Sequence, residues 1–261
     1  MATPSNAGRA QKARPVSQHS RAKNLWENFK SIAGALAIFL LLRAFLVEAY
    51  RIPSGSMIPT LLVGDWLFVN KAIFGAHVPF TNTSLPAYRD PRRGDVVVFV
   101  SPYQADEDSA GRDPTPTLVK RLVGTPGDTL FMRNGVLYVN GIAQRQGYGV
   151  TAPVDPAMAS SVDPLFSWQK NVGLKSSRFG GAPAQPSHDS WGPLVVPPHK
   201  LFMMGDSRYN SKDSRYWGFV PRENVRGKPL FVYYSYNADD SDRPVPMLTD
   251  IRWSRIGHWI K

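Results

Sequence analysis

The longest run of hydrophobic residues in the chain lies near its N-terminus. Residues 32–42 (IAGALAIFLLL) carry no charge, and after Arg43 the run continues through residues 44–47. At about 1.5 Å per residue in a helix this length reaches roughly 24 Å, a little less than the ~30 Å hydrocarbon core of a bilayer, and Arg43 can extend to the interface. The pattern predicts a transmembrane helix over residues 31–50.

The segment before this run, residues 1–30, is polar and basic, and we expect a disordered tail because it contains too little apolar surface to form a core. Its charged residues are one acid, Glu27, and six bases: Arg9, Lys12, Arg14, Arg21, Lys23 and Lys30. Basic segments stay on the cytoplasmic side, so the sequence predicts a cytoplasmic N-terminus and places the chain after Tyr50 on the outer face.

A cleaved signal peptide is an alternative to a retained anchor. Val47-Glu48-Ala49 loosely fits the small-residue pattern of a cleavage site. The long N-terminal tail and the charges of Arg43 and Glu48 at the end of the run favour a retained anchor. N-terminal sequencing of the purified protein separates the two readings.

The rest of the chain alternates between short apolar segments and turns. Segments with strand signals are residues 66–71, 95–101, 117–123, 128–133, 136–140, 200–205 and 229–236. Asn134-Gly135 suits a two-residue type I′ hairpin turn, and between residues 141 and 198 the strand pattern weakens. The sequence therefore predicts a mainly β fold. An antiparallel all-β catalytic domain would be formed by residues 51–140 and 199–261, with an inserted, less regular subdomain at residues 141–198.

Composition and charge narrow the chemistry. The chain has 261 residues and no cysteine, which excludes disulfides, thiolate nucleophiles and Cys-ligated zinc. Its net charge is +11, of which the first 30 residues contribute +5, and the other basic residues are scattered without a recognisable nucleic-acid-binding motif. Contact with anionic lipid headgroups explains this excess better than nucleic acid does. Membrane lipids are therefore an expected partner, and nucleic acid is not.

The ten residues after the apolar run (RIPSGSMIPT) predict a rigid, non-helical turn that presents small hydroxyl groups. Pro53 and Pro59 fix φ and remove amide donors, while Gly55 adopts backbone angles closed to other residues. We interpret Ser56 as a candidate nucleophile. A simple juxtamembrane linker has a similar composition and stays open at this point.

Lys120 interrupts an otherwise apolar strand signal (LVKRLV), where alternation places it on the same face as Leu118. If that face is buried, desolvation lowers the pKa of the lysine and makes it a general base for a serine hydroxyl. The alternative is an edge-strand lysine that faces water.

A Ser-His-Asp triad is a less suitable arrangement for this chain. GxSxG is absent, and the histidines lie in no recognisable aspartate-accompanied motif: His19, His77, His188, His199 and His258.

A third candidate segment is the polar loop at residues 205–218. There Asp213 and Arg215 could form an ion pair, and Ser211 or Ser214 could orient a lysine.

Four segments, taken in order behind the apolar run, closely resemble the boxes of type I signal peptidase, the bacterial leader peptidase. They are residues 53–61, 93–99, 120–128 and 205–218. The resemblance implies that Ser56 is the nucleophile, Lys120 the general base, and the Ser54 hydroxyl with the Ser56 amide the oxyanion hole. It further implies supporting roles for three residues of the last segment: Ser211, which would position the lysine, and Asp213 and Arg215, which would brace the loop. The chain departs from the family pattern at Ser207 and Tyr209, which both lie outside the positions matched to catalytic residues.

The resemblance also implies a function. The chain would be a membrane-bound serine endopeptidase that removes N-terminal signal peptides from exported preproteins by a Ser/Lys acyl-enzyme mechanism, without metal or cofactor. Cutting would follow small residues, and the residues we expect in the substrate pockets are Ile52, Met57, Ile58, Leu67, Val98 and Val119. The expected protein is a monomer that crosses the bacterial inner membrane once, with its catalytic domain on the periplasmic face. A membrane-tethered binding or scaffolding module is the alternative class of function.

Overall fold

The computed structural model describes residues 18–78, 81, 83–144, 162–175 and 177–261. The chain divides into two compact units, residues 1–43 and residues 44–261. Each unit is described separately below.

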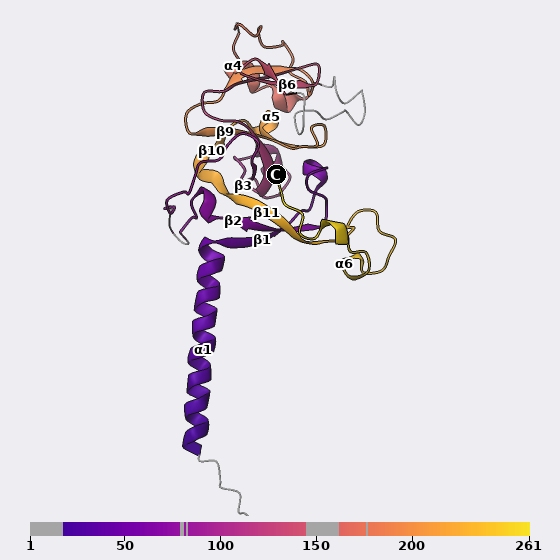
Figure 1. Cartoon of the computed structure of the whole chain (residues 1–261). Coiled ribbons are helices and arrows are strands. Elements are labelled where there is room, and N and C mark those ends of the chain that lie inside the picture. The colour runs from indigo at the N-terminus through magenta and orange to yellow at the C-terminus, as the bar shows by residue number, and fades with distance from the viewer. Residues whose placement is uncertain (1–17, 79–80, 82, 145–161, 176) are drawn as a thin grey trace, which may run out of the picture. The chain divides into compact units, whose positions relative to one another are not determined.

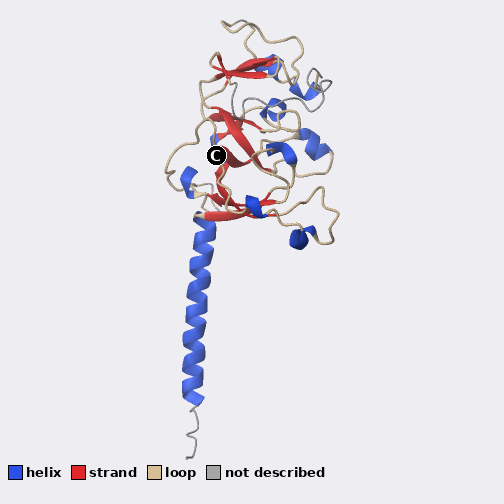
Figure 2. Ribbon diagram, turned by 45° about the vertical axis from the view of Figure 1, so that its right-hand side comes forward, coloured by secondary structure: helices blue, strands red, loops and turns tan. Residues whose placement is uncertain are grey.

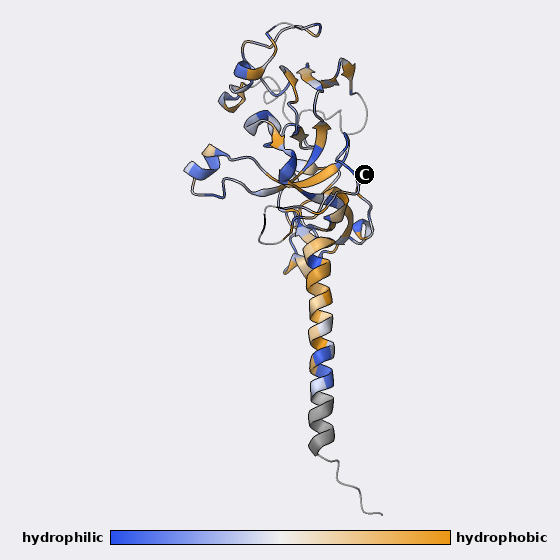
Figure 3. Cartoon of the chain, turned by 90° about the vertical axis from the view of Figure 1, so that its left-hand side faces the viewer, coloured by the Kyte–Doolittle hydropathy of each residue, from blue (hydrophilic) through white to orange (hydrophobic). Residues whose placement is uncertain are grey.

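Helix α1 (Gln18–Phe45) contains the predicted transmembrane segment. Within the described residues it is the one helix long and apolar enough to cross a membrane, over Trp26–Phe45. Figure 3 shows hydrophobic residues along most of this part of the helix.

The bounds of α1 differ from the prediction at both ends. It begins at Gln18, inside the segment we expected to be disordered, and residues three apart stabilise this part: Trp26 stacks on Phe29, and Glu27 lies 3.5 Å from Lys30. It ends at Phe45 rather than at residue 50, because residues 47–51 form strand β1 and bond to another strand.

The unit of residues 44–261 is built from two antiparallel sheets (Figures 1 and 2). The larger sheet has seven strands in the order β1-β2-β11-β3-β4-β9-β10. In chain order these strands are β1 (Val47–Arg51), β2 (Asp65–Asn70), β3 (Val96–Val100), β4 (Thr117–Gly124), β9 (Lys200–Met204), β10 (Val220–Pro221) and β11 (Val225–Ser235).

The smaller sheet has four strands in the order β7-β6-β5-β8: β5 (Thr129–Arg133), β6 (Val136–Val139), β7 (Ile142–Ala143) and β8 (Trp191–Val195). Strand β8 pairs with β5, so the predicted boundary between residues 140 and 141 cuts through one sheet. Trp191 and Leu194 pack into a core with Leu130 and Leu137, which is why β8 joins strands that precede the expected insertion. The part of the insertion at residues 145–161 lies outside the described residues.

The helices of this unit are short: α2 (Ala105–Ser109), α4 (Gln169–Val172), α5 (Ser214–Trp217) and α6 (Pro246–Thr249). Single 3-10 turns are η1 (Gly55–Met57), η2 (Ala72–Phe74), η4 (Pro164–Phe166), η5 (Arg222–Asn224) and η6 (Trp253–Arg255). Their brevity follows from the spacing of Pro and Gly in the sequence. The prediction of a mainly β, antiparallel fold is confirmed.

Strand β3 is buried on both faces, which explains why residues 95–101 do not alternate between apolar and polar side chains. Val96 and Val98 belong to one core cluster, whereas Val97 and Phe99 belong to another on the opposite face. Both faces of β3 are therefore covered, and the strand carries an unbroken apolar run. The predicted hairpin turn is also confirmed, since Asn134 and Gly135 have φ values of 49° and 75° between β5 and β6.

Candidate active site

The turn that carries Ser56 is fixed by bonds on both sides. The amide of Ile52 donates to the carbonyl of Asp65 at 2.8 Å, and the Met57 side chain, 1% exposed, anchors the turn in the core below β2 and β3. The carbonyl of Ser56 accepts a bond from the Ser207 amide at 3.1 Å. The turn is thus attached directly to the polar loop at residues 205–218.

Lys120 reaches this turn from β4, 64 positions further along the chain. Its Nζ lies 2.5 Å from Oγ of Ser56, within hydrogen-bonding distance. Strand β4 pairs with β3 on one side and β9 on the other, so it is a central strand, and Lys120 is only 4% exposed. The reading of Lys120 as a solvent-facing edge residue is therefore wrong.

The burial of Lys120 changes its chemistry. Desolvation is the main effect and lowers the pKa of its ammonium from 10.5 to about 8, with the positive charge of Arg215 acting in the same direction. The carboxylates of Asp213 and Asp206 raise the pKa but do not offset the desolvation. About a tenth of Lys120 is therefore uncharged at pH 7, in the form that can accept a proton from a hydroxyl, and this fraction rises to about half at pH 8.

Asp213 and Arg215 form the ion pair that we expected. Both side chains are fully buried, and two parallel bonds of 2.8 Å join Nε and Nη2 of Arg215 to the two oxygens of Asp213. Asp213 also accepts from the Gly205 amide at 3.0 Å, and Arg215 donates to the Arg208 carbonyl at 2.5 Å. The attraction of Arg215 and these bonds hold the pKa of Asp213 below its usual value although burial acts to raise it. Through these bonds Arg215 connects Arg208, near the start of the loop, with Asp213, near its end.

Ser211, which we expect to position Lys120, lies in this loop. Its side chain is 7% exposed and lines the same cavity as Lys120, yet its hydroxyl has no hydrogen-bond partner among the described residues. A Cβ added at Gly205 would lie 2.2 Å from the Ser211 Oγ and 2.5 Å from the Ser56 carbonyl. Only glycine fits at position 205, between the nucleophile turn and Ser211.

A second buried ion pair was not predicted. Arg121, next to Lys120, bonds through Nε and Nη2 to the two oxygens of Asp206 at 2.7 and 2.6 Å, and Asp206 also accepts from the Thr60 hydroxyl at 2.5 Å. These bonds connect β4, the polar loop and the segment after Ser56. The sequence signal was the adjacent charge in the LVKRLV run, but a spacing of 85 positions gives no hint of the partner.

Two cavities meet at the candidate dyad and share Ser54, Ser56 and Lys120 among their lining residues. One has a volume of about 480 Å³ and extends to the side chains of the polar loop and of residues 104 and 107. The other, of about 110 Å³, lies between the extended segments 50–54 and 117–120. Ser54 is exposed at the start of η1, with an extended backbone (φ −142°, ψ 156°).

The structure separates the six expected pocket residues into three groups. Ile52, Met57 and Val119 line the small cavity. Leu67 and Val98 are fully buried in the core and are absent from the lining of both cavities, because they occupy inward-facing positions of β2 and β3. Ile58 is 41% exposed and packs near Gly55 outside the two linings.

None of the residues lining these two cavities is a histidine. His188 instead bonds to the Tyr216 hydroxyl at 2.9 Å, and His77 bonds to the Val225 carbonyl at 3.1 Å. Within the described residues, no group of three or more His, Cys, Asp and Glu is arranged to hold a metal ion.

Residues 168, 169, 188 and 189 contact the polar loop, a role that was not predicted. Trp168 and Gln169 donate to the Arg215 carbonyl at 2.9 and 3.2 Å. The Tyr209 hydroxyl donates to Asp189, and Tyr209 also lines the larger cavity. Tyr209, where the chain departs from the family pattern, therefore has a hydrogen-bond partner within the expected insertion.

Comparison with known proteins shows the class and the family. A family model described as signal peptidase, peptidase S26, matches residues 25–234. A signal peptidase I of Pseudomonas aeruginosa is 36% identical over 251 residues, covering 89% of this chain and 78% of that protein, and one of Pseudomonas fluorescens is 36% identical over 246 residues with the same coverage. A signal peptidase I of Haemophilus influenzae is 29% identical over 287 residues, covering 96% and 78%. A crystal structure of a signal peptidase I from Enterococcus faecalis is 29% identical, with a TM-score of 0.32, and covers 54% of this chain and 97% of that one.

These sequence matches identify the chain as a serine endopeptidase, a hydrolase. It belongs to the signal peptidase family, peptidase S26. The apolar helix α1 is consistent with a membrane-anchored protein.

Proposed function

We propose that this protein removes N-terminal signal peptides from exported preproteins, with Ser56 as nucleophile and Lys120 as general base. The observation that carries the proposal is the 2.5 Å contact between the Ser56 hydroxyl and the buried amine of Lys120. A serine hydroxyl is a weak nucleophile unless an adjacent base removes its proton, and an uncharged lysine can do so. Membership of the signal peptidase family supports the substrate class.

The chemistry proceeds in two steps. Lys120 takes the proton from Ser56 while Oγ attacks the carbonyl carbon of the scissile peptide bond, and the departing amine receives that proton as the carbon–nitrogen bond breaks. Water then gives a proton to Lys120 and attacks the ester, and the proton returns to Ser56 as the acid is released. Ser56, Lys120 and water account for every proton transfer in this scheme.

The oxyanion formed in each step needs hydrogen-bond donors at the position where charge develops. We assign this role to the Ser56 amide and the Ser54 hydroxyl. Ser54 lines both cavities beside Ser56, which supports the assignment. Ser211, Asp213 and Arg215 would hold the wall of the larger cavity and with it the position of Lys120.

We assign the small cavity to the side chains that precede the cut. It is lined by two extended segments, residues 50–54 and 117–120, between which an extended peptide can add as a strand. A volume of about 110 Å³ suits small side chains, so cutting would follow small residues. The pocket walls would be Ile52, Met57 and Val119.

We further propose that α1 is a retained, single membrane span and that the N-terminus is cytoplasmic. The unit of residues 44–261 would then act on the outer face of a bacterial inner membrane, where preproteins emerge. Its partners would be those preproteins and membrane lipids, and the protein would act as a monomer.

The test is cleavage of a preprotein by the full-length protein in detergent or vesicles. Ser56→Ala and Lys120→Ala should each lower the cleavage rate by at least a thousandfold. Ser109→Ala and Lys170→Ala, both at exposed positions outside the two cavities, serve as matched controls and should keep wild-type rates. An acylating peptide-like inhibitor should label Ser56 in wild-type protein, as located by mass spectrometry.

A membrane-tethered binding module makes the opposite prediction. In that case no serine is labelled, and the substitutions at positions 56 and 120 leave all measurable properties near those of the controls. Full turnover in either variant would refute the assignment of the dyad.

A further inference from the structure

The largest cavity among those described lies away from Ser56 and Lys120. It has a volume of about 640 Å³ and shares no lining residue with either cavity at the candidate dyad. Its walls come from the segment before β3, the turn after β4, the start of β9 and η5. A volume of this size is typical of a small-molecule site.

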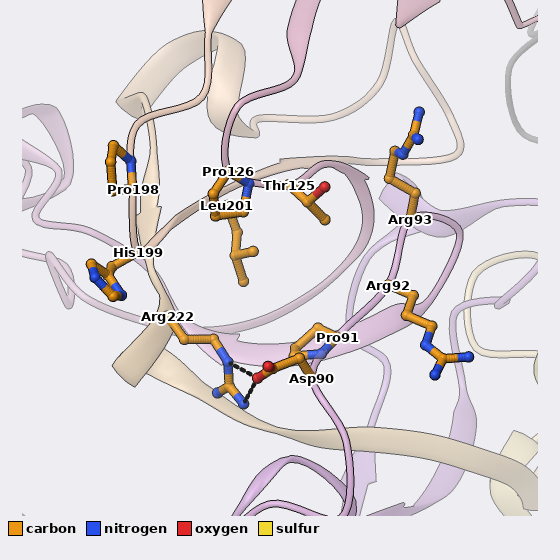
Figure 4. A pocket seen from close by; sticks show the side chains of 10 residues that line it. All are labelled: Asp90, Pro91, Arg92, Arg93, Thr125, Pro126, Pro198, His199, Leu201 and Arg222. Atoms are coloured by element: carbon orange, nitrogen blue, oxygen red, sulfur yellow. Dashed lines mark hydrogen bonds and ion pairs between the residues drawn. The ribbon is translucent and has the colours of Figure 1, made fainter.

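Part of the lining of this cavity is apolar. It is formed by the exposed Pro126 and Pro198 and by the buried Pro91 and Leu201. Figure 4 shows Leu201 and Pro126 near the middle of the cavity. Proline rings and a core-anchored leucine are rigid, so this surface is preformed and loses little conformational entropy when a ligand binds.

The rim carries an excess of positive charge. Arg92 and Arg93 lie on one side of the cavity, with His199 and Arg222 on the other (Figure 4). The one carboxylate in the lining, Asp90, already accepts two bonds from Arg222, at 3.2 and 3.0 Å. Arg222 is therefore already paired, and the excess of positive charge lies on the other side of the cavity.

Among the described residues, the neighbouring carboxylates pair with other side chains and leave the guanidinium of Arg92 without an ion-pair partner. Asp95 pairs with Arg89 and Lys228, and Asp128 pairs with Arg93, whose Nε lies 3.5 Å from it. The guanidinium groups of Arg92 and Arg93 extend outward from the rim in Figure 4. The Arg92 side chain is exposed, and exposed side chains change rotamer within nanoseconds, so it can turn onto a bound anion.

We propose that this cavity binds a small soluble amphipathic anion, a phosphate or carboxylate attached to an apolar body. The apolar body would occupy the surface formed by Pro126, Pro198 and Leu201, and the anionic group would lie at the rim beside Arg92. A guanidinium group can bond to either anion through two donors at once. The site is independent of the peptidase chemistry and does not rest on the proposed function.

The test uses 4-fluorophenyl phosphate as the probe and the full-length protein in micelles of a non-ionic detergent. Fluorine NMR reports binding as broadening and shift of the probe signal, corrected for micelles alone. We expect saturable binding with a dissociation constant in the millimolar range or tighter. Inorganic phosphate and the uncharged 4-fluorobenzyl alcohol should each bind at least tenfold more weakly, because each lacks one half of the ligand.

The variant carries Arg92→Gln and His199→Asn together. Both positions are exposed, so the substitutions should leave the thermal midpoint of unfolding unchanged, and they should weaken probe binding at least tenfold. The matched control is Arg178→Gln, which removes an exposed arginine that lies over Phe179 outside the cavity, and it should bind the probe as wild type does.

Equal binding by the variant and the control overturns the proposal. So does an equal affinity for inorganic phosphate, since the apolar lining would then play no part; this comparison uses wild-type protein and stands even if the variant does not fold. A lipid headgroup is the other source of the same chemistry. Displacement of the probe in nanodiscs of anionic lipid, but not of zwitterionic lipid, supports the site while rejecting a soluble ligand.

Discussion

At the scale of single residues, Lys120 is subject to opposing effects, and the difference between them sets its charge. The carboxylates of Asp213 and Asp206 favour the ammonium form, whereas burial and Arg215 favour the amine. Each carboxylate is already paired with a guanidinium, Asp213 with Arg215 and Asp206 with Arg121. The attraction left for Lys120 is therefore small, and desolvation decides the outcome.

The first prediction concerns the pH dependence of cleavage. Only the uncharged amine accepts the Ser56 proton, so kcat/KM should rise with pH and level off above the pKa of Lys120, at about 8. Lys120→Arg should be inactive at every pH because a guanidinium does not lose its proton in this range. The check is a rate profile from pH 5 to 10, with Lys170→Arg as control. A rising limb centred near 6.5 would instead indicate a histidine.

The second prediction concerns stability. The pKa of Lys120 is lower in the folded protein than in the unfolded chain, so the charged form is disfavoured on folding. Below about pH 8 this effect lowers the free energy of unfolding by its full amount, up to about 3 kcal/mol. The effect disappears as pH rises toward 10.5. Lys120→Met removes this effect and should raise the thermal midpoint at pH 6.5 by several degrees.

The measurement is thermal unfolding of the full-length protein in detergent, followed by circular dichroism at pH 6.5 and 9.5. The advantage of Lys120→Met should shrink at the higher pH. A variant that is less stable than wild type at pH 6.5 would contradict the argument, because the bond to Ser56 would then outweigh the desolvation. Lys170→Met is the control at an exposed position.

The sequence could indicate which residues carry the chemistry but not all of their partners. Lys120 is conspicuous as a charge within an apolar strand signal, and Ser56 as a hydroxyl between two prolines. The Arg121–Asp206 pair is different, because Arg121 and Asp206 are only brought together when β4 and β9 pair. For Ser211 the resemblance implies that it positions Lys120, and this stays a prediction, because its hydroxyl has no hydrogen-bond partner among the described residues.

At the scale of elements, the polar loop at residues 205–218 is fixed from two directions. Its own Asp213–Arg215 pair closes it from within, and residues 168–189 bond to its outer side through Trp168, Gln169, His188 and Asp189. A loop held in this way keeps the cavity wall rigid with few regular hydrogen bonds of its own.

The third prediction tests this outer support. Tyr209→Phe and Asp189→Asn should each destabilise the protein by about 1–2 kcal/mol and lower kcat/KM several-fold, because the bond between the hydroxyl and the carboxylate is lost. The double variant should be little worse than either single one. Thermal midpoints and cleavage rates of the four proteins provide the measurement.

Tyr103→Phe is the matched control for Tyr209→Phe. Tyr103 also donates its hydroxyl to a carboxylate, that of Asp108, but this pair is exposed and should contribute little. Strictly additive effects of Tyr209→Phe and Asp189→Asn would show that the two side chains do not act through each other. That result would contradict the proposal that Asp189 supports the polar loop through Tyr209.

Strand positions were predictable because apolar runs and Asn-Gly turns are local signals. The extent of the insertion was not, since β8 contains Gly192 and Pro193 and resembles a loop by composition. Only its partner β5 makes it a strand. In the same way β11 begins at Val225, four residues before the predicted start, because its first part pairs with β3.

At the scale of the whole molecule, the chain combines a charged N-terminal tail, an apolar helix and a β unit. The first 30 residues hold +5 of the net charge of +11, and α1 begins within them, at Gln18. Since basic residues beside a span resist translocation, this distribution predicts that the N-terminal segment stays on the cytoplasmic side and the β unit lies on the outer side. The pattern was evident from the sequence because it depends on composition and length rather than on tertiary contacts.

The last prediction tests this topology. The chain has no cysteine, so a single introduced thiol gives labelling without background. In sealed right-side-out vesicles, a membrane-impermeant maleimide should modify Asp240→Cys, at an exposed position of the β unit, and should leave Ser5→Cys unmodified until detergent opens the vesicles. Replacing the six basic residues of the tail by Gln should weaken this asymmetry, because the tail would then lack the charge that holds it inside. Labelling of Ser5→Cys in intact vesicles would reverse the assigned orientation, and retention of full asymmetry in the Gln variant would show that charge does not determine it.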